Sequence, residues 1–232
     1  MVSQKMRLLL WRGRYKMTKE SFKILLDQYF FRITYTNDCF ELYKHLIESK
    51  TKYFVEMNFA PAFFQLTYSS LLHTVFIETA KLFDKNSSTS LFKLIEISRQ
   101  NTSLFKTSRD VGYIDCDTDK YVLEKTISID IFSELNDCRQ LLKSVSKERE
   151  NLRNQRNKFY AHLDEAYKDN NGKLQKDFPL PFKDMKKLLQ VASELCNKIS
   201  LIFDESIHAV QSSNVFDVDN LLKKLTKEEI SI

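Results

Sequence analysis

Glycine and proline are scarce in this sequence, with three residues of each among 232. Beta-rich folds and nucleotide-binding loops need glycine at their tight turns, so this scarcity favours long helices joined by few connections. The glycines are also far apart, at Gly13, Gly112 and Gly172. They cannot build a Walker A loop, a GxGxxG loop or a GxSxG elbow, and this excludes the enzyme classes that depend on those motifs.

Long hydrophobic runs and closely spaced cysteines are missing as well. Gln65, Glu78 and Lys81 interrupt the most apolar stretch, so we predict a soluble protein that does not enter a membrane. There is no CxxC pair and no HExxH motif, and we expect neither a metal nor a cofactor. Separated cysteines are typical of reduced core thiols in a cytoplasmic protein; they are Cys39, Cys116, Cys138 and Cys196.

Excess positive charge is confined to the N-terminal segment. The formal net charge is +5, and residues 1–16 contain Lys5, Arg7, Arg12, Arg14 and Lys16 but no acidic residue. The rest of the chain is therefore balanced, and any contact with nucleic acid should be local. We interpret residues 1–16 either as a disordered or added extension or as a basic arm, residues 17–226 as one helical domain, and residues 227–232 as a tail.

Apolar residues recur at helical spacing through most of the chain. This pattern predicts an all-α bundle of about five to seven helices. The helices should cover roughly residues 20–50, 61–83, 90–97, 127–166 (with or without one break), 182–202 and 218–225, with a short helical piece before residue 60. Two polar segments, residues 98–121 and 168–181, are predicted to be loops.

The most informative stretch is RNQRNKFYAHLD, residues 153–164. Val145, Leu152 and Phe159 form a seam at seven-residue spacing that continues to Ala166, and Arg156 lies where this seam would carry another apolar residue. On one straight helix Arg156 and His162 lie roughly 120° and 9 Å apart, so they do not face a common target. Two such helices around a two-fold axis would bring Arg and His from both chains into one cleft, which predicts a homodimer through the motif helix.

These two residue types match the needs of RNA cleavage. RNA carries its own nucleophile, the 2′-hydroxyl, and a cleaving protein must take or position its proton and stabilise negative charge on the phosphate. Histidine titrates near neutral pH and is suited to the first task at position 162. Arginine stays charged and forks onto phosphate oxygens, so Arg156 is suited to the second. Asn157 would hydrogen-bond the phosphate or hold Arg156 in place.

The motif and several other segments resemble a known family. Arg156, Asn157, four residues and then His162 look like the Arg–polar–x(3–5)–His signature of the HEPN superfamily, and RNKFYAHLD is similar to the motif of its AbiU-like abortive-infection family. Further segments occur in the order expected for that family, and the resemblance covers roughly residues 20–226. These segments are APAFF (60–64), AKLFDK (80–85), SLFKLIEI (90–97) and VDNLLKKL (218–225).

The resemblance implies a helical bundle, usually dimeric, with metal-independent endoribonuclease activity and a toxin-like role in defence against phage. It also implies catalytic roles for Arg156 and His162, with Asn157 as their polar companion. The family often has Asp at the position of Asn157, so a role that needs a carboxylate there is in doubt. An antitoxin or a phage-derived trigger would be a further partner.

Other interpretations of these residues stay open. One helix face carries Arg156 together with Arg149, Arg153 and Tyr160. With Lys158, this face can be a phosphate-binding track in which Tyr160 stacks on a base. It can also be a solvated face with Tyr160 packed at a helix contact. His162 can instead be a structural residue that hydrogen-bonds Asp164 or a backbone carbonyl. Arg156 can likewise be a structural residue that forms an ion pair with an acidic side chain. The alternative function is a non-catalytic helical module that binds RNA or a protein. A third, less favoured reading is a partner protein modified at Tyr160 by nucleotidyl transfer.

Overall fold

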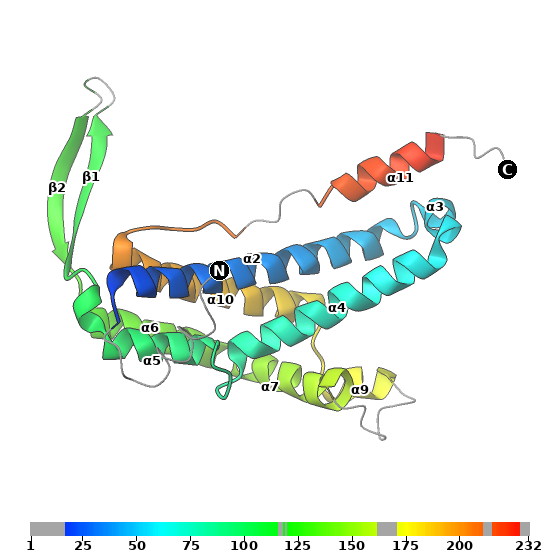
Figure 1. Ribbon diagram of the computed structural model, residues 1–232, viewed down its shortest axis with the longest axis horizontal. Helices are drawn as coiled ribbons and strands as arrows, with labels where there is room; N and C mark the ends of the chain where they lie inside the picture. The colour runs from blue at the N-terminus through cyan, green and yellow to red at the C-terminus, as the bar shows by residue number, and fades with distance from the viewer. Residues whose placement is uncertain (1–16, 116–117, 119, 162–170, 211–214, 228–232) are drawn as a thin grey trace.

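The computed structural model describes residues 17–115, 118, 120–161, 171–210 and 215–227, and Figure 1 shows their arrangement. Its longest element is helix α2 (Lys19–Ser49). Thr18 and Ser21 form a reciprocal capping box at its N-terminus, which satisfies backbone N–H groups that the first turn leaves without partners. A short helix α3 (Phe54–Phe59) follows, and Pro61 begins helix α4 (Pro61–Phe83), where a fixed φ suits the first turn.

The second half of the chain adds the rest of the bundle. Helix α5 (Leu91–Gln100) is capped by Ser90, and a 3-10 turn, η1 (Thr102–Leu104), follows it. Helix α6 (Ile131–Ser144) is capped by Asp130, and helix α7 (Ser146–Gln155) continues into η2 (Arg156–Ala161), which is a π-helix. Helices α9 (Asn171–Asp177), α10 (Phe182–Asp204) and α11 (Asp217–Lys227) complete the described elements.

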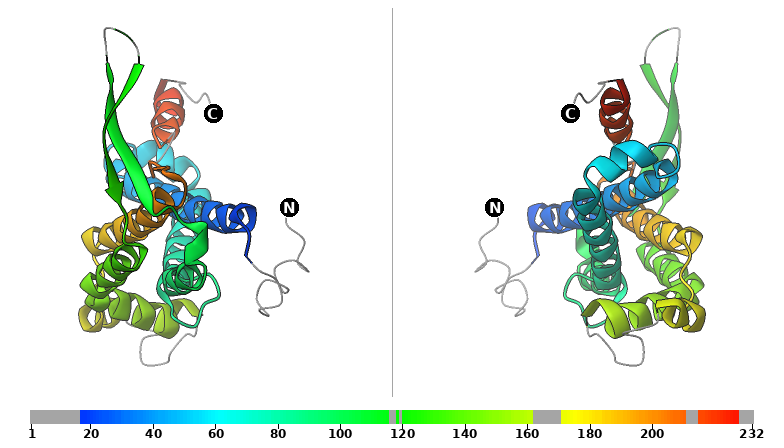
Figure 2. Two further views of the ribbon diagram at one scale, coloured as in Figure 1. Left: turned by 90° about the vertical axis from the view of Figure 1, so that its left-hand side faces the viewer. Right: turned by 90° about the vertical axis from the view of Figure 1, so that its right-hand side faces the viewer.

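Helix α10 lies at the centre of the main core. It packs against α2 and α6, and α2 in turn packs along α4 (Figures 1 and 2). Leu188, Leu195 and Ile199 of α10 are fully buried, together with Phe22 and Ile33 of α2. Each such side chain stabilises the fold by roughly 1.5–3 kcal/mol through burial alone. The mostly helical architecture confirms the fold class predicted from the sequence.

The helices predicted around residues 20–50, 61–83, 90–97, 182–202 and 218–225 are all present within a few residues. The predicted loop at 98–121 is wrong. Strands β1 (Ser108–Asp115) and β2 (Lys120–Ser128) form an antiparallel hairpin that projects from the bundle (Figure 1). The following helix therefore begins at Ile131 and not near residue 127. Because both faces of the hairpin are largely exposed, its strands lack the apolar alternation by which a half-buried strand is recognised.

The predicted loop at 168–181 is also partly wrong, because α9 occupies Asn171–Asp177. Its sequence is rich in residues typical of turns, but Leu174 is 2% exposed and contributes to the buried interior. Gln155 at the end of α7 also contacts Gln175 and the carbonyl of Phe178. Tertiary contacts of this kind outweigh weak local helix propensity.

Candidate functional site

Arg156 stands at the junction between α7 and the π-helix η2. π-Helical turns are rare and frequently occur at functional sites. The side chain of Asn157 folds against the guanidinium, and its Oδ1 atom accepts hydrogen bonds from Nε at 2.9 Å and from Nη2 at 2.8 Å. The sequence interpretation gave Asn157 either this supporting role or a direct contact with phosphate, and the structure has the supporting contact.

A second anchor for Arg156 comes from the end of α4. Asp84 is the C-cap residue of that helix, and its Oδ2 atom accepts a hydrogen bond from Nη1 of Arg156 at 3.0 Å. The other carboxylate oxygen accepts from the backbone N–H of Asn86. Partial burial alone would raise the pKa of Asp84, but the Asn86 N–H, Arg156 and the charge of Arg153 together hold it below its ordinary value. Asp84 is therefore held as a carboxylate.

These contacts fix the orientation of the guanidinium and leave part of it available. A guanidinium has five N–H donors. Among the described residues, three of them are used, one each on Nε, Nη1 and Nη2. The remaining N–H on each terminal nitrogen can donate to a phosphate oxygen. The Arg156 side chain is about one-fifth exposed, so an anion can reach it.

His162 lies outside the described residues, as do Asp164 and Ala166. The side chains of Phe159 and Tyr160 are not described either, although their backbone belongs to η2. The relation between the guanidinium at 156 and the imidazole at 162 therefore stays a prediction. The first two positions of the predicted apolar seam are confirmed, because Val145 and Leu152 are both fully buried.

The other basic residues of the motif lie in different environments. Arg149 points inward: its Nη1 donates to the carbonyl of Leu142 at 2.7 Å, and its Cζ lies 4.6 Å from the ring centroid of Phe92. Burial and the neighbouring charge of Arg153 lower the pKa of Arg149. Such an arginine ties α7 to α5 and has less freedom to follow a nucleic-acid backbone than the predicted track requires.

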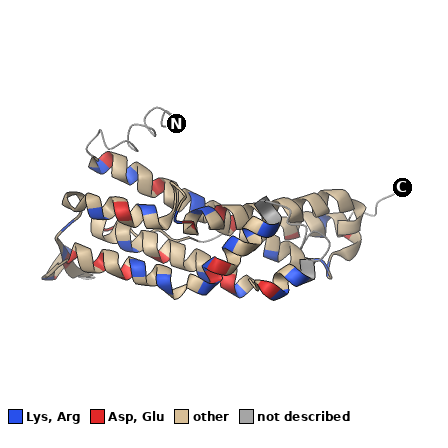
Figure 3. Cartoon of the chain, turned by 90° about the horizontal axis from the view of Figure 1, so that it is seen from below, with Lys and Arg blue, Asp and Glu red and all other residues tan. Residues whose placement is uncertain are grey.

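Arg153 is exposed, and the Lys158 Nζ lies 5.7 Å from the ring centroid of Phe178. Basic and acidic residues are mixed along the helices on this side of the molecule (Figure 3). Arg153, Arg156 and Lys158 thus form a local basic cluster in which Asp84 is the acidic partner of Arg156.

A comparison with known families matches most of the chain. The HEPN family described as AbiU2 matches residues 19–228, which include every described element. This chain belongs to the HEPN AbiU2 family. It is thus an abortive-infection-related HEPN domain, as the motif and the ordered segments predicted. No curated protein and no solved structure matches it.

The sequence did not single out two polar residues beside the motif, Asp84, which binds Arg156, and Gln155, which precedes it. Asp84 lies in AKLFDK, which was identified only as a family segment. Gln155 is fully buried, and its Nε2 donates to the carbonyl of Phe178 at 2.5 Å. Asn151 makes a similar bond to the carbonyl of Pro179. The only available signal for Gln155 and Asn151 was that each is a polar residue beside the apolar seam of α7.

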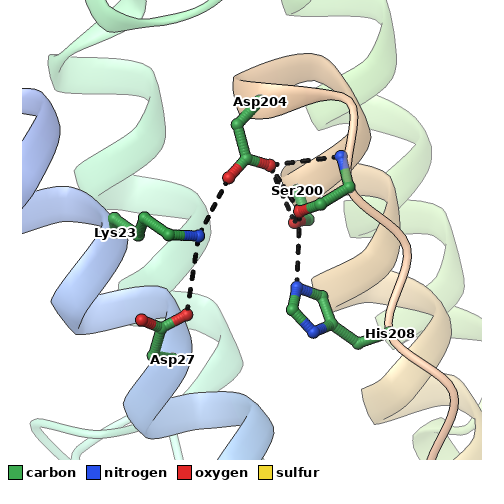
Figure 4. Close-up of polar contacts among 6 residues, drawn as sticks. Lys23, Asp27, Ser200, Asp204 and His208 are labelled. Atoms are coloured by element: carbon green, nitrogen blue, oxygen red, sulfur yellow. Dashed lines mark hydrogen bonds and ion pairs between the residues drawn. The ribbon is translucent and has the colours of Figure 1, made fainter.

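A different polar cluster joins the start of α2 to the end of α10 (Figure 4). Asp204 accepts hydrogen bonds from Lys23, Ser200 and Ser206, and Ser206 Oγ lies 3.3 Å from Nε2 of His208. A Ser–His–Asp triad requires the histidine between the serine and the acid. Here the carboxylate binds the serine directly, and the His208 ring packs on Phe30 with the centroids 4.1 Å apart. The cluster therefore has a structural role: it connects the start of α2 to the end of α10.

The described part of the chain holds no group of three or more His, Cys, Asp or Glu side chains arranged to bind a metal ion. Cys39, Cys138 and Cys196 are buried free thiols, and Cys116 lies outside the described residues. Among the described helices none is both long and apolar enough to cross a membrane.

Proposed function

We propose that this HEPN AbiU2 protein is a metal-independent endoribonuclease that acts as a toxin-like effector in abortive-infection defence against phage. The observation that carries the proposal is the clamp on Arg156. Asp84 and Asn157 hold its guanidinium by three hydrogen bonds, and within the described part of the chain one N–H on each terminal nitrogen is left for an incoming anion. Family membership supports this assignment of the motif.

In the proposed reaction, the 2′-hydroxyl oxygen attacks the adjacent phosphorus. A bond forms between O2′ and phosphorus while the bond from phosphorus to O5′ breaks. The departing O5′ oxygen takes up a proton from water, and the products are a 2′,3′-cyclic phosphate and a 5′-hydroxyl end. His162 accepts or positions the proton of the 2′-hydroxyl. The guanidinium of Arg156 donates to the non-bridging oxygens as negative charge develops on them.

The same proposal covers the assembly of the site, its RNA contacts and its control. The site is composite, with residues of two chains in a cytoplasmic homodimer. Arg153, Lys158 and Tyr160 bind the flanking RNA, and Arg149 supports them from its inward position. An antitoxin or a phage-derived trigger controls the activity. Neither a metal ion nor a cofactor takes part in the proposed chemistry.

The test is cleavage of mixed RNA by purified protein in the presence of a metal chelator. We expect His162→Ala and Arg156→Ala each to reduce the cleavage rate by about 100-fold or more. Arg139→Ala is the matched control, because Arg139 is an exposed arginine on α6. Cleavage that requires added magnesium, or that continues at full rate in His162→Ala, would overturn the proposal.

The second candidate is a non-catalytic module that binds RNA or a protein. The ion pair between Arg156 and Asp84 is the observation in its favour, because a charged pair of this kind also stabilises a fold without taking part in catalysis. Expression of the wild type and of the Arg156→Ala/His162→Ala variant separates the two candidates. Equal growth of the two strains under phage challenge, with the fold intact, would favour the binding module.

A further inference from the structure

A cavity of about 550 Å³ opens beside α2 and α4, outside the HEPN motif. Its described walls come from six residues of α2 and from Glu78 of α4, two helices that pack along each other. Sites for small molecules usually measure roughly 300–1,000 Å³. The cavity is therefore large enough for one ligand of nucleotide size.

The apolar wall of this cavity is a pair of aromatic rings on α2. Phe31 and Tyr35 lie one helical turn apart, with their ring centroids 6.4 Å apart and their planes nearly parallel, at 8°. Phe31 is 75% exposed and Tyr35 is 49% exposed, so the rings offer free surface to a ligand. Planar bases stack on exposed aromatic rings of this kind. This wall favours a flat aromatic ligand.

Arg32 forms a second, charged wall and is held from two sides. Its Nε atom lies 3.3 Å from Oε2 of Glu78, and its Nη1 atom donates a hydrogen bond to Oγ1 of Thr89. Within the described part of the chain Nη2 makes no hydrogen bond, so its N–H groups can donate to a ligand. A positioned guanidinium suits O6 and N7 of guanine, the commonest base contact of arginine.

Asp27 lines the cavity on the other side of the aromatic wall. It is five residues from Arg32, which places the two side chains roughly 140° apart around α2 and about 7.5 Å apart along it. Lys23 lies 3.9 Å from Oδ1 of Asp27 (Figure 4). A carboxylate accepts from N–H groups, and guanine carries two adjacent ones, N1–H and N2–H, next to O6. Adenine has neither O6 nor N1–H, so Arg32 and Asp27 together favour guanine.

We propose that this cavity binds guanine, supplied either by a free nucleotide or by a base of an RNA. The base stacks on Phe31 and Tyr35. Its O6 and N7 atoms accept hydrogen bonds from Arg32, while its N1–H and N2–H groups donate to Asp27.

The connection between α4 and α5 links the cavity to the HEPN motif. Oγ1 of Thr89, which binds Arg32, lies 3.1 Å from Oγ of Ser87. The same connection begins at Asp84, which binds Arg156. A base of an RNA held at Arg156 would reach the cavity along this connection and make cleavage selective for guanine. Only the RNA source rests on the proposed function; binding of a free nucleotide does not.

The experiment is calorimetric titration of the full chain with GMP, with AMP and with the RNA oligonucleotides UUGUU and UUAUU. The oligonucleotides are 2′-O-methylated throughout, so they cannot be cleaved. Each guanine probe that binds should bind at least about tenfold more tightly than its adenine counterpart. Binding of GMP will show that a free nucleotide is sufficient, whereas binding of UUGUU without GMP will show that the base comes from RNA.

Two substitutions test the walls of the cavity. Phe31→Ala should weaken guanine binding by about tenfold or more, because the stacking surface is lost. Asp27→Asn should reduce the preference for guanine over adenine by about tenfold, because the amide keeps one acceptor in place of two. Phe54→Ala is the matched control, since Phe54 is an exposed phenylalanine on α3 that does not line the cavity, and it should bind like the wild type.

Unchanged helical circular dichroism will show that the variants fold. The inference is overturned if no guanine probe binds, if guanine and adenine probes bind equally, or if Phe31→Ala binds like the wild type. A guanine preference that survives Asp27→Asn would also overturn it. Because no probe is cleaved, these results leave the nuclease proposal standing, which depends on cleavage of unmodified RNA.

Discussion

Arg156 shows what a local sequence can and cannot predict about a single residue. Its partner Asn157 is the next residue in the chain, so the sequence was enough to propose the supporting contact. Asp84 is 72 residues away and reaches the guanidinium only because α4 ends beside η2. Spacing along one helix holds no information about such a partner.

The first prediction concerns the ion pair between Asp84 and Arg156. Asp84→Asn should lower the free energy of unfolding by about 1 kcal/mol at neutral pH, because a charge-assisted hydrogen bond is lost. The folded-state pKa of Asp84 lies below its ordinary value of 3.8. The stabilisation is therefore complete above that pH and disappears as the pH falls through the lower folded-state value.

Urea unfolding between pH 3 and 7 checks this prediction. The difference in unfolding free energy between wild type and Asp84→Asn should become smaller as the solution becomes acidic. Asp137→Asn, at an exposed carboxylate of α6, serves as the control and should change stability by less than about 0.5 kcal/mol. A difference between wild type and Asp84→Asn that stays constant across this range would contradict the assignment.

At the level of elements, the sequence was informative where one side of an element is buried. The stripes of α2, α4 and α10 face the core, so their periodicity predicted the helices within a few residues. The hairpin packs neither of its faces extensively and carries exposed apolar residues such as Tyr113 and Leu123. Without a buried face there was no period-two signal to read.

The second prediction concerns Gly112 in β1. A Cβ atom at this position would lie 2.0 Å from the carbonyl oxygen of Val122 in the paired strand, so Gly112→Val cannot keep the present pairing. The hairpin should open locally, with faster amide hydrogen exchange in both strands. The bundle should keep its unfolding free energy within about 1 kcal/mol, because the hairpin projects away from the core.

Leu123→Thr is the control for this substitution. Leu123 is the residue opposite Gly112 and is about half exposed, and threonine suits a strand. The control should keep the slow exchange of the hairpin. If Gly112→Val instead lowers the stability of the whole protein, the hairpin contributes more to the bundle than its exposure suggests.

At the scale of the whole molecule, the buried residues form two separate clusters. The main cluster includes Phe22, Leu135 and Leu195 and joins α2, α6 and α10. The second contains Leu46, Tyr53, Met57, Phe64 and Leu222, and it holds α11 against the end of the bundle where α3 lies. Figure 1 shows α11 at the end opposite the hairpin. Separate clusters of this kind can open independently.

The third prediction follows from these two clusters. Leu222→Ala should release α11 and increase proteolytic cleavage after residue 210, while the thermal midpoint of the bundle changes little. Leu195→Ala, at the centre of the main cluster, should lower the global free energy of unfolding by about 2–5 kcal/mol. Limited proteolysis and thermal unfolding of both variants provide the comparison. Equal global destabilisation by the two substitutions would show a single cooperative core.

The sequence by itself determined the helical class, the main helices, the HEPN motif and the family, because each depends on residues that are neighbours or are regularly spaced along one helix. The tertiary structure alone decided the clamp between Asp84 and Arg156, the inward position of Arg149, the helix at 171–177 and the projecting hairpin. These features arise where distant segments pack together, or where a segment does not pack at all. Contact between distant residues depends on the packed arrangement of all the helices, which no local pattern records.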